Sequence, residues 1–162
     1  MPTPAEKLAE SLEELRKIQR EDGITAIQAS SLSRTHRERL LENGFIQEVI
    51  KGWYIPSRPG TKPGDTTSWY TNFWKFCSDY LNNRFSGRWC LSPEQSISIH
   101  SGNWTVPKQL LVRSPKAHNN LTNLLHGTSI LEITLNIPKK NDIYVKNGVN
   151  IYSLTMALIS SP

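Results

Sequence analysis

The stretch Ser-Arg-Pro-Gly-Thr-Lys-Pro-Gly-Asp at residues 57–65 restricts the possible folds of this chain more than any other segment. Its two Pro-Gly pairs mark turns and interrupt both helices and strands. With 162 residues, the chain is long enough for one large domain or two small ones. We therefore predict an α+β chain in two parts, with a first domain at residues 1–60 and a second, small α+β domain at residues 64–162.

Composition indicates a folded protein without a membrane anchor. Hydrophobic residues make up 37% of the chain, and no apolar run approaches the ~20 residues that span a bilayer. The N-terminal stretch MPTPAEKLAESLEEL lacks the apolar centre of a signal peptide, so we expect a cytoplasmic protein. Cys77 and Cys90 form no CxxC pair and have no histidine at metal spacing. We expect two reduced, packed thiols and neither a metal nor another cofactor.

The net charge of +5 permits an anionic partner such as DNA. Residues 1–60 hold nine Lys/Arg and nine Asp/Glu and sum to zero, whereas residues 61–162 hold ten against five and carry the whole excess. A DNA reader in the first part would be basic only locally. This distribution argues against a purely electrostatic binder.

The first part is expected to contain two helices, a short strand and a hairpin. Thr3 as cap, Pro4 at the first position and Glu6 in a capping box predict a helix to about Arg20, ended by Asp22-Gly23. The β-branched segment 24–30 suggests a brief strand. A second helix is expected from about Thr35, with Thr35 and Glu38 as a capping box and Gly44 as its stop.

The runs FIQEVI and WYIP around Lys51-Gly52 predict a β-hairpin. Helix, short strand, helix and hairpin is the order of a winged helix-turn-helix, in which the second helix enters the major groove of double-stranded DNA and the hairpin is the wing. The candidate DNA-binding residues lie on that helix, on the wing and just after it: Arg34, Thr35, Arg37, Glu38, Arg39, Lys51, Trp53 and Arg58. We expect Arg34, Thr35 and Arg37 to reach the groove while Lys51 steadies the wing.

A second interpretation stays open for the same residues. The arginines are then solvated and partly neutralised by Glu38 and Glu42, and the small domain is a protein-interaction module. Trp53 could face a nucleic-acid backbone or close the small core. For the core position we favour Tyr54 or Ile55.

The second part should begin with an aromatic helix at residues 66–85, capped by Asp65, whose aromatic stripe favours a core rather than a ligand site. A helix capped by Ser92, with Gln95 closing a capping box, should follow. Strands are expected at residues 109–115, 129–135 and 142–154, the last as a hairpin around Asn147-Gly148, and then a final helix starts.

Few residues of the second part suggest chemistry. His100 has no companion nucleophile, so we favour a structural cap or a packed polar residue, with hydrolysis as the alternative. The acidic residues, Glu132 among them, are scattered singly and form no carboxylate pair. A secondary basic patch gathers Lys108, Arg113 and Lys116, with His118 nearby. It extends a nucleic-acid footprint, pairs with an acidic partner or is simply solvated.

Four segments together resemble the N-terminal region of a group of bacterial Fic-family proteins: PAEKLAESLEELRKIQ, LSRTHRERLLENGFIQEVIKGWYIPSRP, WCLSPEQSISIHSGNWTVPKQLLVRSPK and LLHGTSILEI. The layout is also similar to AbiEi-type antitoxin regulators, with Leu91-Ser92, Gln95-Ser96, His100 and the LLVRSP strand at matching positions. The resemblance implies a transcriptional-regulator or antitoxin-like module that contacts DNA through the helix at Arg34–Arg39 and the wing. Separately, we consider a homodimer of this chain.

The Fic resemblance also implies what this chain lacks. Fic enzymes transfer AMP to a protein hydroxyl with a His-Pro-Phe…Gly-Asn-Gly-Arg loop, but no histidine here precedes a proline. The family's inhibitory motif is also missing, because the only Glu-Asn pair, at Glu42, has Glu38 four residues earlier. We expect a non-catalytic fragment whose adenylyltransferase domain, a possible partner, lies beyond Pro162.

Overall fold

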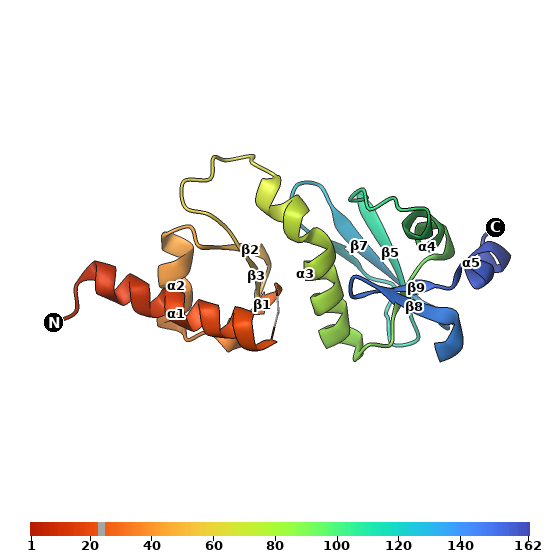
Figure 1. The fold of residues 1–162 in the computed structure, drawn as a ribbon, viewed down its shortest axis with the longest axis horizontal. Helices are drawn as coiled ribbons and strands as arrows, with labels where there is room; N and C mark the ends of the chain where they lie inside the picture. The colour runs from red at the N-terminus through yellow and green to blue at the C-terminus, as the bar shows by residue number, and fades with distance from the viewer. Residues whose placement is uncertain (23–24) are drawn as a thin grey trace. The chain divides into compact units, whose positions relative to one another are not determined.

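The computed structural model describes residues 1–22 and 25–162 and is a mixed α+β structure, as predicted. The chain divides into two compact units, Met1–Phe76 (unit 1) and Cys77–Pro162 (unit 2) (Figure 1). No helix of the described ranges is long and apolar enough to cross a membrane.

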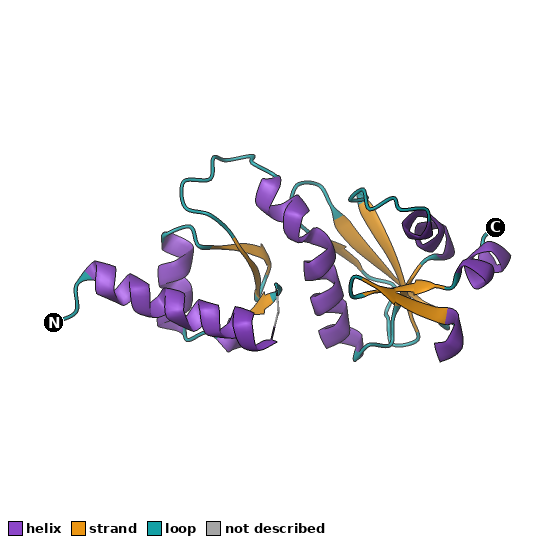
Figure 2. Ribbon diagram, viewed as in Figure 1, coloured by secondary structure: helices purple, strands orange, loops and turns teal. Residues whose placement is uncertain are grey.

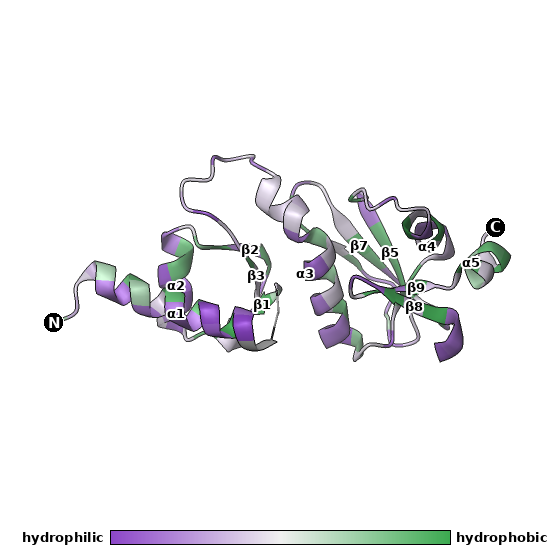
Figure 3. Cartoon of the chain, in the orientation of Figure 1, coloured by the Kyte–Doolittle hydropathy of each residue, from purple (hydrophilic) through white to green (hydrophobic). Residues whose placement is uncertain are grey.

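Unit 1 begins with helix α1 (Pro4–Asp22). The Glu6 N–H donates to the Thr3 hydroxyl at 3.2 Å, which confirms the predicted cap. Figure 3 shows hydrophilic and hydrophobic residues alternating along α1, as expected for a helix with one packed face. The predicted stop at Gly23 and the first residue of the predicted strand, Ile24, lie outside the described residues.

Strand β1 (Ile27–Gln28), the 3-10 turn η1 (Ala29–Ser31) and helix α2 (Arg34–Glu42) follow. The predicted cap at Thr35 is wrong, because Ser33 accepts the His36 N–H at 3.2 Å and places Thr35 inside the first turn. The predicted stop is confirmed: Gly44 has φ +77° and donates to Leu41 O, while Phe45 donates to Leu40 O.

Strands β2 (Ile46–Ile50) and β3 (Trp53–Pro56) form the predicted hairpin around Lys51-Gly52. Strand β1 pairs antiparallel with the other edge of β3, which gives a three-stranded sheet in the order β1-β3-β2. Tyr54 and Ile55 are both buried, as favoured. The core of this unit joins one face of α1 and α2 to the sheet through Leu15, Ile27, Leu32, Leu40, Ile46 and Tyr54.

Helix α3 (Thr67–Phe85) contains the division between the units. Asp65 accepts the Thr67 N–H at 2.8 Å, as predicted for its start. Trp69, Phe73 and Phe76 are fully buried, and the Trp69 ring meets the other two edge-on at centroid distances of 5.4 Å. The aromatic stripe is therefore core, as predicted.

Unit 2 is built on a four-stranded sheet in the order β4-β5-β7-β6, from β4 (Cys90–Leu91), β5 (Gln109–Ser114), β6 (Leu121–Asn123) and β7 (Ser129–Thr134). The two predicted strands, β5 and β7, pair in parallel, and the short outer strands pair antiparallel with them. The C-terminal half of α3 lies on one side of these strands and α4 and α5 on the other (Figure 1).

Helix α4 (Pro93–His100) has the predicted Ser92 cap, which accepts the Gln95 N–H at 3.3 Å. The predicted capping box is wrong. The Gln95 amide turns to strand β5, where it donates to Gln109 O at 3.1 Å and accepts the Leu111 N–H at 3.0 Å. The side chain thereby ties α4 to the sheet.

Strands β8 (Ile143–Lys146) and β9 (Val149–Tyr152) form the hairpin predicted around Asn147-Gly148, after the 3-10 turn η2 (Lys140–Asp142). Both turn residues have positive φ, 49° and 80°, as a type I′ turn requires. Helix α5 (Leu154–Ser160) lies beside α4 (Figure 2).

Candidate nucleic-acid interface

The first turns of α2 hold the exposed part of the candidate interface. Arg34, Thr35 and Glu38 are exposed, and Arg34 Nε donates to Glu38 Oε1 at 2.9 Å. The two side chains keep 82% and 54% of their surface open to solvent. The hydrogen bond and the charge of Glu38 raise the pKa of Arg34. Because exposed pairs of this kind are weak, the pair can open when a phosphate or a guanine edge competes for Arg34.

Two other arginines of α2 bind the protein itself. Arg37 is half-buried, and its Nη1 donates to the Ala29 carbonyl of η1 at 2.8 Å. Arg39 Nη1 donates to Lys7 O at 3.0 Å and to the Ser11 hydroxyl at 2.9 Å, both on α1. Their guanidinium groups fasten α2 to the rest of unit 1.

Ser11 and His36 extend this contact between the helices. The Ser11 hydroxyl is buried and lies 2.7 Å from His36 Nδ1. Arg37 also lies close enough to Tyr54 for its charge to act on the phenol. Burial raises the pKa of Tyr54, the charge of Glu48 raises it further, and Arg37 lowers it. The helix is therefore oriented by polar contacts as well as by its apolar face.

The hairpin tip is the second exposed part of the interface. Lys51 is exposed in the turn, and Gly52 has φ +85°. The Gly52 carbonyl accepts the Ala29 N–H at 2.9 Å, so the turn is anchored to η1. Trp53 is half-buried, and its ring meets Phe76 edge-on at 6.3 Å. This contact places Trp53 in the packing of unit 1.

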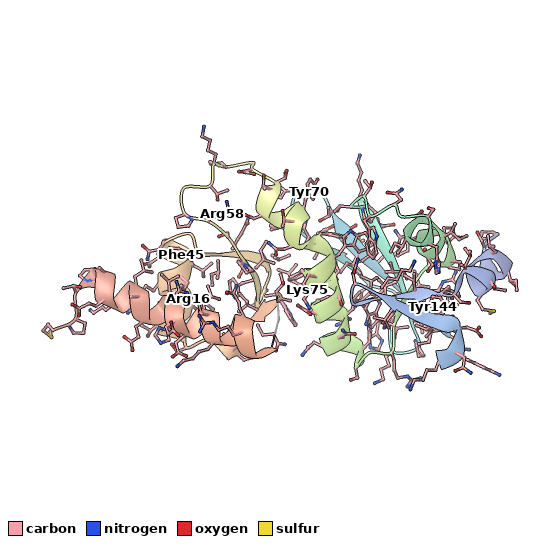
Figure 4. All side chains as sticks on the ribbon, in the orientation of Figure 1. Arg16, Phe45, Arg58, Tyr70, Lys75 and Tyr144 are labelled. Atoms are coloured by element: carbon pink, nitrogen blue, oxygen red, sulfur yellow. The ribbon has the colours of Figure 1, made fainter. Side chains whose placement is uncertain are left out.

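Arg58 is exposed in the loop after β3, where Figure 4 labels it. A shallow pocket of about 390 Å³ lies beside it, lined mostly by hydroxyl and charged side chains: Ser57, Arg58, Thr61, Asp65, Thr67, Ser68 and Thr71, together with Pro56. Arg58 is its one cation, and the Asp65 carboxylate accepts the Thr67 N–H. The loop therefore offers a single positive charge next to hydroxyl groups.

The secondary basic patch of unit 2 also contains both exposed cations and a cation that contacts the protein itself. Lys108 and Lys116 are exposed, as is His118. Arg113 is half-buried and lies over the Tyr152 ring, 5.8 Å from its centroid, while its Nη1 donates to the Tyr152 hydroxyl at 3.0 Å. Arg113 therefore has a packing role between β5 and β9.

The His100 ring has a backbone partner, because its Nε2 lies 2.7 Å from Tyr152 O. The ring also meets Tyr144 at a centroid distance of 5.9 Å. These contacts fit the packed polar role favoured above. Among the described residues, no three His, Cys, Asp or Glu side chains are grouped closely enough to hold a metal ion.

One buried ion pair was not found by sequence reasoning. Glu132, fully buried on β7, lies 2.7 Å from Arg84 Nε on α3, and Arg84 is 32% exposed. Neither carboxylate oxygen has a hydrogen bond of good geometry to a described residue. Burial raises the pKa of the nearby Tyr80, and the charge of Glu132 adds to this. The sequence feature that could have indicated this buried pair is the single acid, Glu132, within the apolar run SILEITL.

Comparison with protein-family models, with curated proteins and with solved structures gives no match to this chain.

Proposed function

We propose that unit 1 is a winged helix-turn-helix that binds double-stranded DNA. The observation that carries the proposal is the joint exposure of the first turns of α2 and of the hairpin tip within one compact unit. The order α1, β1, α2, β2, β3 is that of a winged helix, in which a helix enters the major groove and a hairpin contacts the flanking backbone.

The contacts divide the candidate residues into two roles. Arg34, Thr35 and Glu38 are free to approach base edges, where arginine pairs with guanine and a carboxylate accepts from cytosine. Lys51 and Arg58 are suited to phosphates. Arg37, Arg39 and Trp53 support the interface, since each contacts the protein itself. Lys108 and Lys116 would belong to a separate, weaker contact.

The broader role that we propose is regulatory. The chain acts as a cytoplasmic, antitoxin-like regulator region, itself non-catalytic, of a Fic-family protein whose AMP-transferase domain it locates or restrains. The support is the sequence resemblance set out above. Sequencing the full reading frame tests it, because a downstream His-Pro-Phe…Gly-Asn-Gly-Arg loop is expected. Without that loop, a free-standing antitoxin becomes the better proposal.

A salt series tests DNA binding. The affinity of the chain for promoter DNA, followed by fluorescence anisotropy, should fall linearly on a log–log plot against salt concentration. One triple variant removes the exposed cations of the interface: Arg34→Ala, Lys51→Ala and Arg58→Ala. Losing the two phosphate contacts of Lys51 and Arg58 should flatten the slope by about 1.8, and losing the base contact of Arg34 should lower the affinity further.

A matched control triple removes the same charge from α1: Arg16→Ala, Lys17→Ala and Arg20→Ala. Because both triples change the net charge equally, only a local interface separates them. Equal slopes for the two triple variants, or no affinity of the unaltered chain for DNA, would refute the proposal that unit 1 binds DNA.

A second candidate function is a protein-interaction module. It is favoured by the Arg34–Glu38 pair, which neutralises the exposed cation of α2, and by the inward contacts of Arg37 and Arg39. On this view the surface recruits a substrate or partner of the Fic domain. The unaltered chain would then show no salt-dependent affinity for DNA.

A further inference from the structure

Strand β8 forms an open edge of unit 2. Among the described residues, it is paired only with β9. Tyr144 is 51% exposed and Val145 67%; Figure 4 labels Tyr144 on this strand. An exposed edge strand with aromatic and β-branched side chains is a template for pairing with another strand.

The ladder shows which backbone groups of β8 point outward. Lys146 opposes Val149 and Tyr144 opposes Ile151, and the Ser153 N–H donates to Asp142 O at 2.7 Å. Because hydrogen-bonded pairs alternate along an antiparallel ladder, these positions bond to β9 and the residues between them turn away. The N–H and C=O of Val145 therefore point outward.

Ile143 turns outward as well, but only its carbonyl is free to pair. Its N–H donates to Lys140 O, which closes the 3-10 turn η2. The edge therefore offers one donor, from Val145, and the carbonyls of Val145 and Ile143 as acceptors.

The sequence of this edge is complementary to itself. Reading Asp142-Ile143-Tyr144-Val145-Lys146 against its own reverse places Asp opposite Lys, Ile opposite Val and Tyr opposite Tyr. Opposite charges and β-branched or aromatic pairs are the combinations that stabilise neighbouring antiparallel strands. This symmetry favours a second copy of the chain as the partner of the edge.

We propose that β8 is a homodimerisation strand, which pairs antiparallel with β8 of a second copy about a two-fold axis at Tyr144. Val145 N–H of each copy donates to Ile143 O of the other, and Lys146 lies opposite Asp142 of the second copy. Two hairpins then make one four-stranded sheet. A strand pair alone buries less than the ~1,200 Å² of a standard interface, so the dimer is weak and depends on concentration.

Cysteine cross-linking tests the register. In Tyr144→Cys, the two cysteines form a non-hydrogen-bonded pair with Cα atoms about 4.5 Å apart, within the range of about 4.4–6.8 Å for disulfides. In the control Val145→Cys, the cysteine is more exposed, but each one opposes Ile143 and is offset from its counterpart. Under a mild oxidant, Tyr144→Cys should give a disulfide-linked dimer at least about tenfold faster than Val145→Cys.

The native cysteines leave this experiment undisturbed. Cys77 and Cys90 are buried, and burial raises the pKa of Cys90 to about 12 and that of Cys77 as well. Both remain protonated thiols at the pH of the experiment. Equal cross-linking rates for the two variants would overturn the register.

Charge exchange tests the pairing without cysteine. Sedimentation of the whole chain over a concentration series should show reversible dimers. Lys146→Asp should raise the dissociation constant at least about tenfold, since it places like charges opposite each other twice. The double variant Asp142→Lys/Lys146→Asp restores opposite charges and should return the constant to within about threefold of the original.

Two results would refute the homodimer. One is a chain that stays monomeric at every concentration, which leaves the edge to a strand of another protein or to none. The other is a dimer to which both charge variants are indifferent. The experiment contains no DNA, so its failure leaves the proposed function untouched.

Discussion

Replacing Arg84 with alanine should lower the free energy of unfolding of the protein by about 3 kcal/mol. Glu132 is fully buried and its Oε1 lies 2.7 Å from Arg84 Nε. Breaking a buried pair costs about 3–5 kcal/mol, because the remaining charge loses its partner in a place that water does not reach. The Arg84 side chain is 32% exposed, so in the variant water can partly take the place of the guanidinium beside Glu132. We therefore expect the lower end of the range of about 3–5 kcal/mol.

Urea unfolding at neutral pH, followed by circular dichroism, measures this loss. The double variant Arg84→Ala/Glu132→Gln replaces the carboxylate with a neutral amide of the same shape and should recover at least about half of it, since no buried charge is left unpaired. The control is Arg88→Ala, at an exposed position, which removes the same charge and should change the free energy of unfolding by no more than about 0.5 kcal/mol. A loss below about 1 kcal/mol for Arg84→Ala, or a double variant less stable than it, would refute the reasoning.

Three further predictions concern stability and the thiols. Ser33→Ala removes the cap of α2 and should cost about 1 kcal/mol, while Thr35→Ala should change thermal stability by less than about 0.5 kcal/mol; equal effects would contradict the cap assignment. Leu40→Ala leaves a cavity at a fully buried position and should lower the free energy of unfolding, measured in urea, by about 2–5 kcal/mol. Because burial raises the pKa of Cys90 to about 12 and also that of Cys77, the unfolded thiols ionise first, near pH 8.5. Stability should therefore be full below that pH and fall above it, and a thiol reagent at pH 8 should label two cysteines only after unfolding.

The helices and hairpins could be predicted because their signals are local. A cap, a stop residue and an Asn-Gly or Lys-Gly turn lie within a few residues of the element that they define, as at Thr3, Gly44 and Asn147-Gly148. Strands β4 and β6 were not predicted, since segments of two and three residues carry no periodicity. They become strands only because β5 and β7 offer edges.

The capping errors have a common physical cause. Ser33 and Thr35 are equally able to cap, and which one does so depends on where the chain leaves η1. Gln95 had a capping role available at its own helix but lies within reach of two backbone groups of β5, 14 and 16 residues away. A polar side chain bonds the nearest unpaired groups in space, and spacing along the chain does not reveal them.

The cations of the candidate interface could be predicted only in part for the same physical cause. The sequence contains five cations in this region. Three lie on α2, one lies in the hairpin and one follows it: Arg34, Arg37, Arg39, Lys51 and Arg58. It cannot show that Arg37 bonds a carbonyl eight residues away, or that Arg39 bonds groups 28 and 32 residues away. Three of the five remain exposed. If unit 1 binds DNA as proposed, few cations are available for phosphate contacts, so we expect base contacts from Arg34, Thr35 and Glu38 to contribute much of the affinity and mutated operators to weaken it sharply.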